Sequence, residues 1–113
     1  MKPVRTIDVL RAARKRIDDK SRWTRLVPAR DRVGIPVDAD DESARSWCVL
    51  GAVNADTPDS VRGHESTWRL TGALRIIAVR LGYDTIGAAN DLGGHAVALS
   101  ILDAAIAELE ASQ

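Results

Sequence analysis

Apolar residues recur at steps of three and four along much of the chain, a spacing that places them on one face of an α-helix. It predicts four helices, over residues 7–20, 42–54, 65–81 and 95–110. The last has the clearest helical period, at Ala98, Ile101, Leu102, Ala105, Ile106 and Leu109. A further single helical turn is expected at residues 85–90, and Gly82 is expected to end the third helix in a left-handed conformation.

The second predicted helix carries a stripe of small and apolar residues: Ala44, Trp47, Cys48, Gly51, Ala52 and Ala55. Asp40 or Asp41 is expected to cap this helix. The small members of the stripe allow another helix backbone to approach closely, so the stripe predicts the centre of the core. Cys48 would then lie well inside the helix on its buried face, where a thiol behaves as a small hydrophobic group.

The helical period fades between residues 22 and 40, where Pro28, Gly34 and Pro36 interrupt the apolar positions. Residues 24–27 and 33–37 could pair as two short strands across a turn at residues 29–32. An irregular loop is the alternative. We therefore predict a mainly α fold, a compact bundle of about four helices with a small β-hairpin or irregular insert at residues 23–37.

Length and composition are consistent with this fold. The 113 residues suggest one domain, spanning residues 1–113, and a 4% aromatic share favours helices over strands. A single cysteine excludes an internal disulfide and fits a cytoplasmic location. Basic residues interrupt the first apolar stretch, so no signal peptide is expected, and no run is long enough for a membrane span.

Charge is unevenly distributed although the net charge is zero. Residues 1–32 contain 11 Lys and Arg against 4 Asp, a balance of +7, and residues 33–113 carry the compensating −7. One interpretation is a basic surface for nucleic acid or an acidic protein, using residues 5–32. The other is that the basic segment packs against the acidic remainder of its own fold. The candidate interaction surface comprises Arg11, Arg14, Lys15, Arg22, Trp23, Arg25 and Trp68.

Few residues suggest chemistry. Cys48 with His64 or His95 and an Asn90 or Asp91 partner could form a nucleophilic site, but a thiol inside a helix argues against it. The two histidines are too isolated for a metal site, and no cofactor is expected. Asn90, Asp91 and His95 form a candidate polar site. Alternatively, Asn90 and Asp91 cap the helix that follows them.

Three segments resemble a family of small bacterial and phage proteins of unknown function. These are the segment from Trp47-Cys48 to Gly51-Ala52-Val53 in the second predicted helix, the Asn90-Asp91 pair, and the last helix at residues 101–106. The resemblance covers about residues 6–109. Family members often carry a Trp just before the Asn-Asp pair, whereas this chain has Ala89. The resemblance implies a shared fold and no known activity.

Taken together, the sequence predicts a non-catalytic binding protein whose partner is another protein or a second copy of itself. The resemblance suggests an accessory factor of a phage or mobile element. The alternative is a nucleic-acid-binding protein that uses residues 5–32, and the third hypothesis is a small enzyme dependent on Cys48. No membrane partner is expected.

Overall fold

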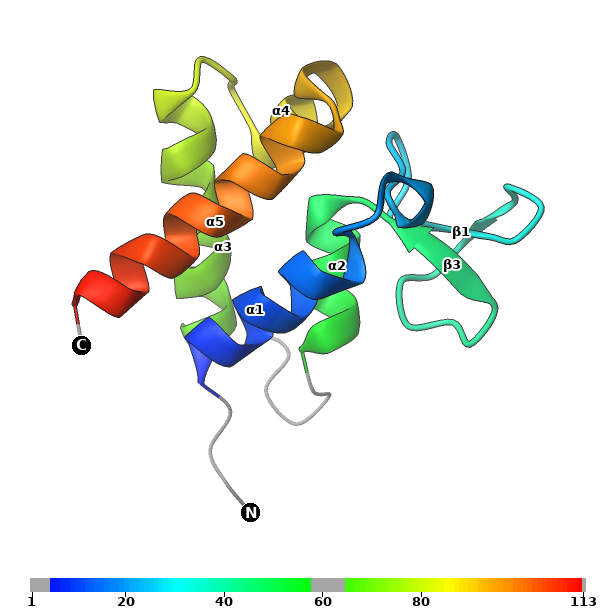
Figure 1. Cartoon of the computed structure of the whole chain (residues 1–113), viewed down its shortest axis with the longest axis horizontal. Helices are drawn as coiled ribbons and strands as arrows, with labels where there is room; N and C mark the ends of the chain where they lie inside the picture. Colours follow the sequence, from blue (N-terminus) through cyan, green and yellow to red (C-terminus); the bar gives the residue numbers. More distant parts are fainter. Residues whose placement is uncertain (1–4, 58–64, 113) are drawn as a thin grey trace.

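The computed structural model describes residues 5–57 and 65–112, and it leaves out the side chains of residues 65–69. Its helices are α1 (Thr6–Arg16), η1 (Lys20–Arg22), α2 (Val49–Asp56), α3 (Glu65–Arg80), α4 (Ile86–Gly93) and α5 (His95–Ala111). Its strands are β1 (Ala29–Asp31), β2 (Pro36–Val37) and β3 (Ala44–Trp47). The protein is thus mainly helical, with a small sheet at one end (Figure 1).

The helical body is held together by the faces that the apolar spacing predicts. α1 packs chiefly against α2 and α5, and α5 also packs against α3 and α4. The largest fully buried side chains of the described residues are Leu10, Ile17, Val49, Leu74, Asn90, Ile101 and Leu102. Gly82 ends α3 with a φ of 97°, as predicted, and the amide of Tyr83 donates to the carbonyl of Ala78.

The helix count differs from the prediction, because the described residues contain five α-helices rather than about four. The single turn expected at residues 85–90 extends to Gly93 as α4. Thr85 caps it by accepting a hydrogen bond from the amide of Ala88 at 2.9 Å. A side-chain cap and a buried face make this short helix stable in the fold, although its sequence is too short for a helical period.

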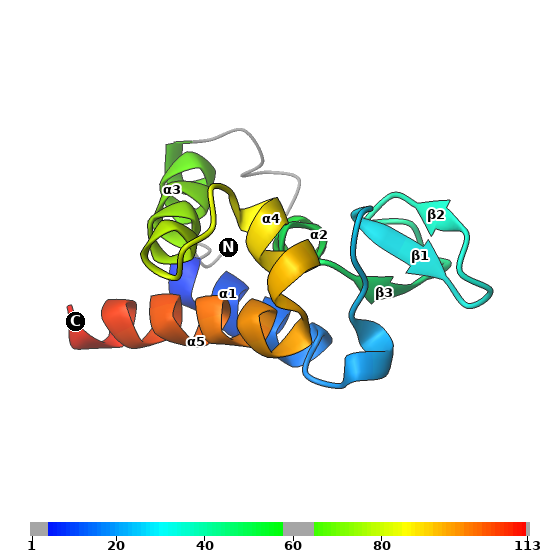
Figure 2. The ribbon, with the colours of Figure 1, turned by 90° about the horizontal axis from the view of Figure 1, so that it is seen from above.

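A three-stranded antiparallel sheet of order β2-β1-β3 occupies the region of the predicted insert. The hairpin prediction was right in kind but wrong in register, because β1 begins at Ala29, where the turn was expected. Asp31 sets the actual turn, since its Oδ1 accepts from the amides of Val33 and Ile35, both at 2.9 Å. Figure 2 shows β1 and β2 projecting from the helical body.

The predicted helix over residues 42–54 is wrong in its first half. Ala44–Trp47 is a strand that pairs with β1, and the helix starts only at Val49. Asp41 caps a tight turn instead, where its Oδ1 accepts from the amide of Ser43 at 2.8 Å. Ala44 and Trp47 are buried in a strand as they would be in a helix, so their spacing did not distinguish the two.

Candidate functional site

The change at Trp47 moves Cys48 from the middle of a helix to the N-cap of α2. Its Sγ accepts a hydrogen bond from the amide of Gly51 at 3.2 Å, and its own amide donates to the carbonyl of Pro28 at 3.1 Å. A Cβ on Gly51 would lie 1.9 Å from that carbonyl oxygen. Gly51 therefore admits the backbone of the preceding loop, not the second helix that the stripe predicted.

Asn90 and Asp91 lie inside α4 and do not cap α5, whose N-cap is Gly94 without a side-chain hydrogen bond. Asn90 is 1% exposed and uses both ends of its amide. Its Oδ1 accepts from Trp23 Nε1 at 2.8 Å and from the amide of Val49 at 3.1 Å. Its Nδ2 donates to the carbonyl of Thr24 at 3.1 Å. This one side chain joins α4, the start of α2 and the loop after η1.

Asp91 holds the next part of the same loop. Its Oδ1 accepts from the amide of Leu26 at 2.9 Å and from Asn90 Nδ2 at 3.0 Å. Leu26 has a φ of 74° and is 74% exposed. The other described residues with positive φ are glycines: Gly34, Gly82 and Gly94. An exposed leucine is therefore held in a conformation that favours glycine.

These contacts surround a solvent-open hollow of about 220 Å³, which we call the Cys48 hollow. It is lined by Leu26, Val27, Pro28, Cys48, Leu50, Ile86, Gly87, Asn90 and Asp91. Leu50, in the first turn of α2, is 39% exposed. The hollow thus has largely apolar walls with a thiol, an amide and one carboxylate among them.

The environment of Cys48 favours the neutral thiol. Burial raises the pKa of Cys48, and the negative charge of Asp91 raises it further, although the amides of Gly51 and Leu50 act in the opposite direction. A nucleophilic thiol needs a lowered pKa or an adjacent base. Among the described residues, no histidine lines the hollow.

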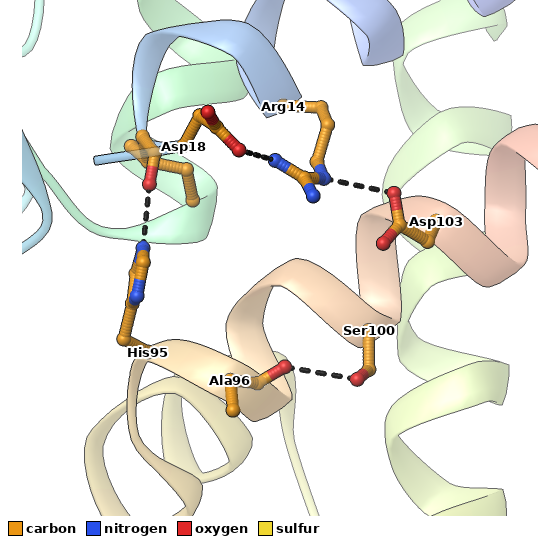
Figure 3. A network of polar contacts seen from close by, with 7 residues as sticks. Arg14, Asp18, His95, Ala96, Ser100 and Asp103 are labelled. Atoms are coloured by element: carbon orange, nitrogen blue, oxygen red, sulfur yellow. Dashed lines mark hydrogen bonds and ion pairs between the residues drawn. The ribbon is translucent and has the colours of Figure 1, made fainter. Parts of the chain in front are cut away.

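His95 lies at the first position of α5, and its described contacts are with Ile17 and Trp23, not with Cys48. Its Nε2 is 2.6 Å from the carbonyl oxygen of Ile17, which can only accept, so this nitrogen carries the proton (Figure 3). Its ring also packs 5.7 Å from the ring of Trp23. His95 therefore fastens the start of α5 to the end of α1. His64, the other candidate, lies outside the described residues.

The predicted basic surface is partly neutralised within the fold. Arg11 pairs with Glu110 at 2.9 Å, and Arg14 pairs with Asp103 at 2.8 Å and with Asp18 (Figure 3). Arg16 pairs with Asp56 at 2.7 Å and covers the ring of Trp47. These contacts agree with the interpretation that the basic segment packs against acids of its own chain.

The remaining members of the candidate interaction surface are dispersed. Lys15 and Arg22 are exposed, and both line a second hollow together with Trp47. Trp23 is buried, with Arg25 stacked on its ring at 4.9 Å. Trp68 lies in α3, and its side chain is outside the described residues.

Sequence reasoning missed Leu26, and it grouped Cys48 with Asn90 or Asp91 only in the nucleophilic site that it considered and did not favour. The Trp47-Cys48 segment and the Asn90-Asp91 pair both belong to the motifs that resemble the family. Their occurrence in the same family pattern was the signal that the two could lie close together. Nothing in a leucine between Arg25 and Val27 predicts a positive φ. Within the described residues, no group of three or more His, Cys, Asp or Glu side chains could hold a metal ion. No helix of the same residues is long and apolar enough to cross a membrane.

Comparison with known proteins gives a family without an assigned activity. No curated protein and no solved structure matches the chain. A model of a family of unknown function, DUF6197, matches residues 1–108. This match confirms the predicted resemblance to an uncharacterised family, and because it spans nearly the whole chain, the protein belongs to the DUF6197 family.

Proposed function

We propose that this protein is a non-catalytic binding protein whose partner inserts an apolar side chain into the Cys48 hollow. The observation that carries the proposal is Leu26, an exposed leucine in the left-handed region at the edge of the hollow. The left-handed conformation costs an L-residue about 1–2 kcal/mol. A residue that meets this cost without burying its side chain points to a role outside folding.

The position of Leu26 is set by the fold. Asp91 accepts a hydrogen bond from the amide of Leu26. Asn90 accepts one from Nε1 of Trp23, which lies three residues before Leu26 in the chain. The loop between these anchors therefore has little freedom. A site that is already ordered loses less conformational entropy when a partner binds.

The walls of the hollow suit an apolar group. Leu26 and Leu50 are exposed, and Val27, Pro28 and Ile86 complete the apolar lining. Covering a leucine side chain completely contributes about 1.5–3 kcal/mol. Two partly exposed leucines can therefore supply a useful share of a binding free energy.

The environment of Cys48 supports binding over catalysis. Burial raises the pKa of the thiol by more than the place of Cys48 at the N-cap of α2 lowers it, so the thiol is protonated near neutral pH. A nucleophilic cysteine needs a lowered pKa.

The test is a selection from a random library of 12-residue peptides displayed on phage, with the wild-type protein as bait. Selected peptides are then measured against Leu26→Asn, because asparagine accepts the left-handed conformation and removes the apolar side chain. The matched control is Val33→Asn, since Val33 is 72% exposed and lies on the β1–β2 turn, away from the hollow.

We expect the selected peptides to bind Leu26→Asn at least tenfold more weakly than wild type and to bind Val33→Asn unchanged. Failure to enrich any peptide would overturn the proposal. Equal binding to wild type and to Leu26→Asn would overturn it as well.

A further inference from the structure

We infer that the occupant of the Cys48 hollow is a segment of another protein in which a positively charged side chain neighbours the inserted apolar one, and that Asp91 pairs with this charge. The inference rests on the binding role proposed above and adds the chemical class of the ligand.

The size of the hollow favours a side chain over a cofactor. Its volume of about 220 Å³ is below the roughly 300–1,000 Å³ that is usual for sites of drug-sized ligands. It is open to solvent along the exposed side chains of Leu26 and Leu50, so a chain can pass over it while one side chain enters.

Among the described residues that line the hollow, Asp91 carries the only formal charge. The other lining residues are apolar or neutral, and burial keeps Cys48 protonated. A carboxylate beside apolar walls is complementary to an ammonium or guanidinium group, whose attached methylene groups can cover part of the apolar surface.

The carboxylate of Asp91 is also available and oriented. None of the ion pairs between described residues involves Asp91, whereas Asp56, Asp103 and Glu110 each pair with an arginine. Oδ1 of Asp91 accepts from the amide of Leu26 and from Asn90, and Oδ2 takes part in neither bond. The two donors orient the carboxylate before a ligand arrives.

A second copy of the chain is the main competing occupant. The β1–β2 turn combines Arg32 with exposed Val33 and Ile35, which is a cation beside apolar side chains. Docking this turn into the hollow of a second copy could be reciprocal, which would close a two-fold dimer, or head-to-tail. Asp31, however, holds the turn as a tight loop by accepting from the amides of Val33 and Ile35, whereas the open hollow suits a chain that passes over it. We therefore favour a different protein, and self-association becomes an outcome of the test.

The experiment repeats the peptide selection with Asp91→Asn as a second bait. Asparagine keeps an Oδ1 acceptor for the amide of Leu26 and removes only the charge. The control is Asp38→Asn, which removes the same charge from an exposed residue that does not line the hollow.

We expect peptides selected on wild type to carry Lys or Arg within two positions of their apolar anchor. Peptides selected on Asp91→Asn should keep the anchor and lose this preference. A lysine-containing peptide should bind Asp91→Asn about threefold to tenfold more weakly, as for a partly exposed ion pair, and Asp38→Asn unchanged. High salt should reduce the difference.

A second measurement changes the peptide instead of the protein. Replacing the peptide lysine with norleucine should weaken binding to wild type by the same factor and should not weaken binding to Asp91→Asn, because the two changes remove one interaction.

The outcomes separate the two proposals. Peptides that depend on Leu26 but show no basic preference would overturn this inference and leave the binding role intact. Peptides that do not depend on Leu26 would overturn the binding role itself. A light-scattering mass that rises with concentration for wild type but not for Leu26→Asn would identify a second copy as the occupant and overturn this inference.

Discussion

Asn90 and Asp91 are neighbours in α4, yet they hold two regions that differ in almost every physical respect. Asn90 lies in the interior, where it satisfies Trp23 Nε1, the amide of Val49 and the carbonyl of Thr24. Asp91 is half-buried and holds Leu26 at the edge of an open hollow. The first region is buried and fully hydrogen-bonded, and the second is exposed and strained.

Within one dipeptide, Asn90 therefore serves the stability of the fold, and Asp91 serves the proposed binding site. Polar groups around Asn90 gain partners on folding, so that region stabilises the protein. Leu26 adopts an unfavourable φ and keeps its side chain in water, so its conformation lowers stability. Changes on the two sides should therefore move the free energy of unfolding in opposite directions.

The largest effect is expected for Asn90→Ala. The substitution leaves Trp23 Nε1 and the amide of Val49 without their acceptor inside the protein, and each unsatisfied group costs about 1–3 kcal/mol. We expect the free energy of unfolding to fall by about 3–5 kcal/mol in urea denaturation. Ser100→Ala, at an exposed position on α5, is the control and should change it by less than about 0.5 kcal/mol. A loss below about 1 kcal/mol for Asn90→Ala would remove the contrast with Leu26.

A smaller effect of opposite sign is expected for Leu26→Asn. Asparagine tolerates the left-handed region better than leucine, and little buried surface is lost at this position. We expect the free energy of unfolding to rise by about 1 kcal/mol, measured by the same method. Val33→Asn, which also replaces an exposed apolar residue but not one with positive φ, should change it by less than about 0.5 kcal/mol. A decrease for Leu26→Asn would show that the leucine contributes to folding after all.

The smallest effect concerns the thiol between the two regions. Because its pKa is raised in the folded state, we expect Cys48 to react with iodoacetamide at pH 8 more slowly in the folded protein than in urea. Asp91→Asn removes one cause of the raised pKa and should increase the folded-state rate by less than about threefold. Rapid alkylation of the folded protein would support the catalytic hypothesis.

The same pKa shift predicts a pH dependence of stability. A raised folded-state pKa means that the folded state favours the neutral thiol. The resulting stabilisation is fully present below the unfolded-state pKa and is lost as the pH rises through the folded-state pKa. Cys48→Ala should remove this dependence from urea denaturation curves recorded at alkaline pH.

The apolar spacing was sufficient to predict most of the helical body. α3 and α5 follow from it because buried positions repeat at helical steps from Leu70 to Ala78 and from Ala98 to Ala105. Of the helix predicted over residues 42–54, only the second half is helical, as the greater part of α2. Ala44 and Trp47 are three positions apart. Both side chains are buried in the strand observed, and both would be buried in the helix expected. Only pairing with β1 decides between them, and that pairing joins residues distant in sequence.

The sequence alone therefore predicted the mainly helical fold class, the helix-rich core and a small insert that is either a hairpin or irregular, because these depend on patterns within a few turns of chain. Only the tertiary structure determined three features that those patterns do not predict. They are the hydrogen bonds of Asn90 with Trp23 and Val49, the left-handed conformation of Leu26, and the position of Cys48 at the start of a helix. Each depends on groups that meet across 41 to 67 residues, or on a backbone angle that such contacts impose. The local conformational preferences of the sequence do not determine these long-range contacts, and the candidate site is built from them.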